Sequence, residues 1–181
     1  MSKITIHKMK NILLVFLSIG LIITGFLLYQ EREENNNQYK LFLNKFYDNV
    51  NLTLSYMEND EYTELEEGSL TKYMTELGMR LEKTNMTLEA GRSFVSRDIP
   101  MNKFTFFTLP VHQFAENGEL TAEEMRYLEF LEEKLTSIQS QLYSEDTGQE
   151  NPNISVEEFG EIIALAVQDR DYRQVYPDMV N

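Results

Sequence analysis

His112 is the residue in this sequence whose type most directly suggests chemistry. Apart from His7 it is the only histidine, and histidine is the residue type most often used as a general base near neutral pH. A nucleophilic triad would place it beside a serine in a context such as G-x-S-x-G, and no such motif occurs. We therefore interpret His112 as a histidine on a short helix rather than as a catalytic base.

A dense group of carboxylates is the second candidate for chemistry. A carboxylate pair can hydrolyse glycosides when one member sits in an apolar cleft with a raised pKa, and carboxylates also bind cations. The calcium-loop pattern fails here and again at residues 146–157, because neither stretch has glycine at the sixth position with oxygens at the first, third and fifth. Since the chain has 30 acidic residues, we interpret the group as a solvated helix end. It comprises Glu58, Asp60, Glu61, Glu64, Glu66 and Glu67.

The composition excludes several other classes of site. Cysteine is absent, so there is no thiol nucleophile, disulfide or cysteine-based metal site. The formal charge is −14, and the first thirty residues hold three lysines and no acid, which leaves 13 basic and 30 acidic residues, or −17, for the rest. Such a surface repels nucleic acid. The sequence predicts no catalytic residue, no metal ligand and no cofactor.

An uncharged apolar segment lies near the N-terminus, ILLVFLSIGLIITGFLL at residues 12–28. Residues 11–29 would form a helix about 28 Å long, enough to cross the apolar core of a bilayer. Lysines before it and glutamates after it predict a cytoplasmic N-terminus, residues 1–10, and an extracytoplasmic remainder. A cleavable signal peptide is the alternative, but Leu28, Tyr29 and Gln30 do not resemble a small-residue cleavage site. A buried core helix is the other alternative.

Apolar residues at three- and four-residue steps predict several amphipathic helices after this segment. The first helix should end near residues 59–61. The second should continue to Arg97, where Ile99-Pro100 closes it. Two stripes define these helices: Tyr39, Phe42, Phe46, Val50, Leu54 and Met57, and then Leu70, Tyr73, Met74, Leu77, Leu81, Thr84, Leu88, Phe94 and Val95.

Capping boxes mark the start of two further helices. Thr121 with Glu124 precedes the first, and Ser155 with Glu158 precedes the second. The apolar seam of the helix after Thr121 either forms part of the core or, alternatively, pairs with a second copy in a homodimeric coiled coil. The apolar residues are Met125, Leu128, Leu131, Leu135, Ile138 and Leu142 in the first, and Phe159, Ile162, Ile163 and Ala166 in the second.

These patterns predict an all-α chain, in which a single transmembrane helix precedes an antiparallel extracytoplasmic bundle of three to five helices. The bundle should occupy residues 30–145. A polar linker, a short helix and a tail should follow over residues 146–181. Whether the membrane helix continues through Asn35–Asn37 is left open by the sequence.

An aromatic strip between the second and third bundle helices is the candidate partner-binding surface. One interpretation is that it closes the open end of the helical core, which we favour. The other is an exposed apolar patch that receives another protein. The strip consists of Phe104, Phe106, Phe107, Leu109 and Phe114, with Val111 between the last two.

The layout resembles the N-terminal region of the membrane-anchored YpeB proteins of spore-forming bacteria. The resemblance covers at most residues 1–145. It rests on the glycine-containing anchor ILLVFLSIGLIITGFLLYQERE and on the run PMNKFTFF…FAENGELTAEEMRYLEFLEEKLTSIQSQL at residues 100–142. It implies a non-enzymatic accessory role, in which the protein stabilises or localises a partner such as a cell-wall lytic enzyme.

The sequence therefore favours a membrane-anchored, non-enzymatic docking or scaffold protein of a bacterial cell envelope. Its partners would be the lipid bilayer, through residues 11–29, and an envelope or membrane protein; a homodimer is an additional option. Two alternatives stay open. One is a small-molecule sensor that acts with a membrane partner, and the other is an envelope hydrolase that uses a glutamate.

Overall fold

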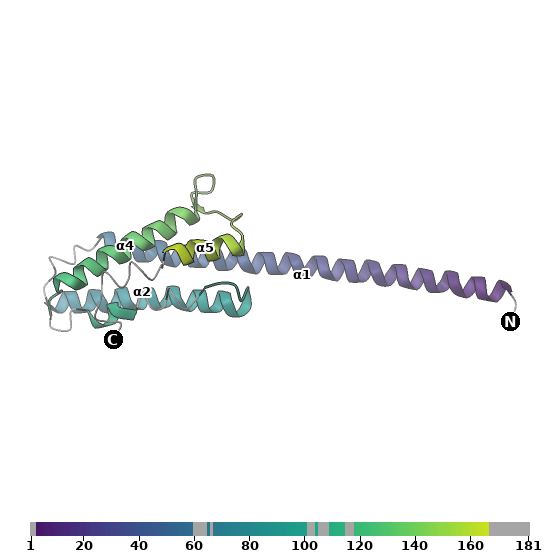
Figure 1. Ribbon diagram of the computed structural model, residues 1–181, viewed down its shortest axis with the longest axis horizontal. Coiled ribbons are helices and arrows are strands. Elements are labelled where there is room, and N and C mark those ends of the chain that lie inside the picture. Colours follow the sequence, from purple (N-terminus) through teal and green to yellow (C-terminus); the bar gives the residue numbers. More distant parts are fainter. Residues whose placement is uncertain are drawn as a thin grey trace. The chain divides into compact units, whose positions relative to one another are not determined.

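The computed structural model describes residues 3–59, 65, 67–100, 104, 109–114 and 118–166 of the chain. The chain consists of two compact units, Met1–Gln38 and Tyr39–Asn181. The described elements are α1 (Lys3–Asn59), α2 (Glu67–Phe94), the 3₁₀ helix η2 (Leu109–Gln113), α4 (Ala122–Leu142), β1 (Tyr143–Ser144), β2 (Gln149–Glu150) and α5 (Val156–Ala166) (Figure 1). The predicted all-α class is confirmed for these residues, apart from one short strand pair.

The first unit is a single stretch of α1. Asn35–Asn37 are helical, so the asparagines interrupt neither the helix nor its hydrogen bonds. Among the described residues, no helix has a stretch both long enough and apolar enough to cross a membrane. The predicted membrane segment includes Ile12 and Val15, whose side chains lie outside the described residues.

The second unit has a continuous apolar core built on residues 39–57 of α1. All six residues of the predicted stripe are buried, and Leu43 and Tyr47 are buried beside them. Within this core the Phe46 ring contacts the rings of Phe104 and Phe159, with centroids 6.0 and 5.1 Å apart in edge-to-face geometry. Such contacts add specific geometry to the burial of large aromatic surfaces. This half of α1 is therefore the central helix of the unit.

Helix α2 lies antiparallel to this half of α1 (Figure 1). The Asn49 amide donates to Thr87 Oγ1 at 2.8 Å, and farther along α1 the ring of Tyr56 stacks on Tyr73 at 4.9 Å. Residues later in α1 thus contact residues earlier in α2, as expected for two antiparallel helices. The predicted α2 stripe is buried from Leu70 to Leu88.

The predicted C-terminus of the second helix was wrong by one turn. The helix ends at Phe94 instead of Arg97, because the Gly91 carbonyl accepts hydrogen bonds from both Val95 N (2.8 Å) and Ser96 N (3.0 Å). This pair of bonds is a helix-terminating arrangement that turns the chain. Phe94, the last residue of α2, departs from the predicted stripe and is 80% exposed, whereas Val95 packs against the core.

Helix α4 begins at the predicted capping box. Glu124 N donates to Thr121 Oγ1 (3.2 Å), and Thr121 N donates to Glu124 Oε2 (2.7 Å). The seam from Leu128 to Leu142 is buried within the unit, whereas Met125 is half-buried. The seam therefore supplies core residues, which is the favoured of its two interpretations.

Helix α5 also starts at its predicted box, since Glu158 N donates to Ser155 Oγ at 3.1 Å. Its buried face enters the same core, with the Phe159 ring 5.2 Å from that of Phe42 in an edge-to-face contact. The antiparallel pair β1–β2 lies between α4 and α5, and Gly148, in the turn that joins the two strands, has φ +67°. That left-handed conformation suits glycine in a tight turn.

Gly91 of α2 is the position where the core leaves no room for a side chain. A Cβ there would collide with the Phe42 ring, whereas a Cβ at Gly68, near the start of the same helix, meets nothing. We expect Gly91→Ala to lower the free energy of unfolding by about 1–3 kcal/mol through overpacking. Gly68→Ala should raise it by up to about 1 kcal/mol, since alanine favours helix. Urea unfolding followed by circular dichroism measures both, and equal stabilisation by the two alanines would contradict the close approach of Phe42.

The Tyr39 hydroxyl is buried and has no hydrogen-bond partner among the described residues. Burial raises the pKa of this phenol, and the nearby Glu158 carboxylate raises it further. The folded protein therefore resists ionisation that the unfolded chain undergoes near pH 10. The contribution of neutral Tyr39 to the free energy of unfolding is therefore fully present below about pH 10 and is lost as the pH rises above that value.

We expect Tyr39→Phe to keep or raise stability at pH 7, by up to about 1–3 kcal/mol, because an unsatisfied hydroxyl is removed. It should also reduce the alkaline loss of stability. Part of that loss should stay, because burial raises the pKa of Tyr47 as well. Urea unfolding at several pH values tests this against Tyr143→Phe, whose side chain in the same unit is 43% exposed. An unchanged pH profile would show that Tyr39 ionises in the folded state.

Candidate functional site

Most of the acidic group at residues 58–67 lies outside the described residues. Glu58 is exposed near the end of α1, while Asp60, Glu61, Glu64 and Glu66 lie outside the described residues. In the part of the chain that the structure describes, no three side chains of histidine, aspartate or glutamate are placed to hold a metal ion.

His112 lies on η2 and is exposed. Its imidazole ring is packed against Gly78 of α2, at the point where a Cβ would collide with it. The glycine thus creates the space in which η2 lies against α2. This contact gives His112 a packing role that needs no acid–base chemistry.

The aromatic strip supplies core residues at both of its ends. Phe104 and Phe114 are buried; the first contacts Phe46, and the second meets Tyr127 edge to face at 5.5 Å. Val111 between them is buried as well. Phe106 and Phe107 lie outside the described residues, as does the side chain of Leu109. The structure therefore brings Phe104 and Phe114 together with the core, which is the favoured interpretation for those two residues.

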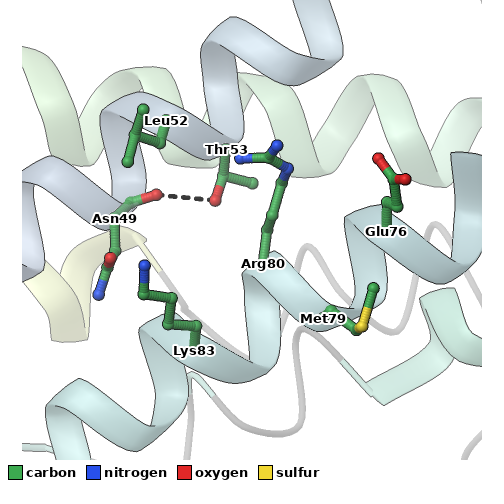
Figure 2. A pocket seen from close by; sticks show the side chains of 7 residues that line it. All are labelled: Asn49, Leu52, Thr53, Glu76, Met79, Arg80 and Lys83. Carbon is green, nitrogen blue, oxygen red and sulfur yellow. Dashed lines mark hydrogen bonds between the residues drawn. The ribbon is translucent and has the colours of Figure 1, made fainter.

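A groove between α1 and α2 is the site that the sequence patterns did not reveal. Its volume is about 280 Å³ and it is open to solvent. Figure 2 shows the side chains of both helices around it. The lining residues are Asn49, Leu52 and Thr53 from α1, and Glu76, Met79, Arg80 and Lys83 from α2.

The floor of the groove is polar but buried. Asn49 is 4% exposed and Thr53 is fully buried. Thr53 Oγ1 donates to the Asn49 carbonyl at 2.8 Å (Figure 2), and the Asn49 amide donates to Thr87 Oγ1 on α2. Thr87 in turn donates to the Lys83 carbonyl at 2.9 Å. The bond between Asn49 and Thr87 ties the two helices together beneath the groove, whereas the other two lie within one helix each.

One wall of the groove carries two cations, Arg80 and Lys83, on adjacent turns of α2. The Arg80 guanidinium lies 4.4 Å from the centroid of the Tyr56 ring, and that ring stacks on Tyr73. Cation–π attraction of this kind favours this orientation of the guanidinium. Neither Arg80 nor Lys83 forms an ion pair among the described residues, and Glu76 pairs with Lys72 at 4.0 Å.

The sequence feature that could have indicated the groove is the spacing of its lining residues. Asn49, Thr53 and Tyr56 on α1 repeat at helical steps, as do Glu76, Arg80 and Lys83 on α2. Each set flanks the apolar stripe of its helix by one position. Only the packing of α1 on α2 shows that the two flanks face each other.

Comparison with protein-family models, curated proteins and solved structures found no match.

Proposed function

We propose that the chain is a single-pass membrane protein that presents its helical second unit outside the membrane as a docking or scaffold module. The observation that carries this proposal is the exposure of the first unit. Every large apolar side chain described from Leu13 to Leu28 is exposed, by 48 to 73%. These side chains point to all sides of the helix, so no face is shielded. A helix that is apolar all round is stable only in a core or in lipid.

The polar groups of this segment are compatible with lipid. Ser18 Oγ donates to the Leu14 carbonyl and Thr24 Oγ1 donates to the Gly20 carbonyl, both at 2.9 Å. Each hydroxyl is thus satisfied within the helix, as an apolar medium requires. Residues 11–29 supply about 28 Å of helix, close to the thickness of a bilayer core.

The charges on either side of the segment favour one orientation. Lys3, Lys8 and Lys10 precede it, and acidic residues follow from Glu31 onward. Basic residues are retained on the cytoplasmic side of a membrane. We therefore place the N-terminus in the cytoplasm and residues 30–181 outside the cell membrane.

A docking role, without catalysis, suits a second unit whose centre is filled by aromatic side chains. Phe42, Phe46 and Phe159 occupy the region where a bundle would hold a buried ligand. The resemblance to anchored YpeB proteins points the same way. The partner would be an envelope or membrane protein, and a second copy of the chain is the alternative. A small-molecule module that acts with a membrane partner is the second candidate function, and the α1–α2 groove favours it.

The absence of cysteine allows a clean test of topology. We expect a Glu82→Cys variant, on the exposed side of α2, to react with a membrane-impermeant maleimide in intact bacterial cells. A Ser2→Cys variant should react only after the membrane is permeabilised. The wild-type chain is the unlabelled control. Equal reaction of the two cysteines in intact cells, or reaction of neither, would refute the proposed topology.

The docking role predicts a specific partner in cross-linked, intact membranes. We expect that partner to be lost from purifications of Phe106→Asp or Phe107→Asp, since a charge in an apolar contact surface opposes binding. Phe94→Asp is the matched control, because Phe94 is 80% exposed and outside the strip. Circular dichroism confirms that each variant is folded. An unchanged set of partners would rule out the strip as the docking surface.

A further inference from the structure

We propose that the groove between α1 and α2 binds a small organic anion. Arg80 and Lys83 would hold its carboxylate or phosphate group, and Leu52 and Met79 would contact a short apolar part. This proposal concerns the second unit alone and does not depend on membrane anchoring.

The unpaired cations are the first argument. The chain has 30 acidic residues against 16 basic ones, so a cation on its surface has many carboxylates to pair with. Arg80 and Lys83 nevertheless have no carboxylate partner within the described ranges. They are also three residues apart on one helix, so their like charges repel each other across one turn. An anion between them would remove that repulsion.

The orientation of Arg80 is the second argument. The guanidinium is held over the Tyr56 ring at 4.4 Å, and Tyr56 is fixed by stacking on Tyr73 at 4.9 Å. A fixed guanidinium loses little conformational freedom on binding, and its fork of donors matches a carboxylate or phosphate. Arg80 is therefore pre-organised for an anion, with Lys83 as a second, flexible positive charge.

The remaining walls define the size and character of the ligand. The volume of about 280 Å³ lies just below the range of drug-sized pockets, roughly 300–1,000 Å³, so the groove suits only a small ligand and is too small for a peptide helix. Leu52 and Met79 are 50% and 54% exposed at its edge, where an apolar group would cover them. The buried polar floor of Asn49 and Thr53 stops the groove from being a purely hydrophobic site. A carboxylic acid with a few carbon atoms matches these features.

Methionine methyl groups offer a direct readout of binding. Met79 lines the groove, whereas Met86, which is 62% exposed on the same helix, does not. The full chain, labelled with ¹³C-methyl methionine and kept in a mild detergent, would be titrated with butyrate, inorganic phosphate or neutral butyramide at constant ionic strength. Met79→Leu and Met86→Leu assign the two signals.

We expect a saturable shift of the Met79 signal with butyrate, with a dissociation constant on the order of 1 mM, and no shift of Met86. Arg80→Gln and Lys83→Gln should each weaken binding about tenfold or more, as expected for loss of a charge-assisted contact. Lys40→Gln, at an exposed lysine of α1 outside the groove, should leave it unchanged. Far-UV circular dichroism checks that the variants fold.

Several outcomes would decide the matter. Saturation by butyrate alone assigns a carboxylate ligand, and saturation by phosphate alone assigns a phosphate ligand. The proposal is overturned if neither anion saturates the Met79 shift, or if butyramide binds as tightly as butyrate. It is also overturned if Lys40→Gln weakens binding as much as Arg80→Gln does.

Discussion

The contact of Phe42 and Phe46 with Phe159 is the interaction on which the second unit depends. It joins α1 to α5, although more than a hundred residues separate them in the sequence. Phe104 enters the same contact from the segment after α2. Because these rings fill the centre of the core, α2 and α4 have a fixed surface on which to pack, and the remaining apolar stripes find their places around it.

Helix α1 illustrates how one secondary structure can serve two environments. From Leu13 to Leu28 its apolar side chains are exposed, whereas from Tyr39 to Met57 an apolar stripe is buried by other helices. The first pattern is apolar all round and the second is amphipathic. Both parts are α-helical, so the difference between them lies in their side chains.

The packing of α2 on α1 has a consequence for binding. The apolar stripes face each other and close the core, so the polar flanks of the same two helices are brought together at its edge. Asn49 and Thr53 lie beneath the groove, and Arg80 stands over Tyr56 at its wall. An open, positively charged groove thus arises beside a filled core in a chain whose net charge is −14.

The sequence by itself determined the features that depend on neighbouring residues. Helical stripes and the capping boxes at Thr121 and Ser155 were readable because their spacing is set by the 3.6-residue turn. Features that depend on distant residues were decided only by the tertiary structure. The end of α2 at Phe94, the burial of Phe104 and Phe114, and the groove all follow from which helix faces pack together. Local periodicity shows that a helix has an apolar face, but it does not specify the partner that covers that face.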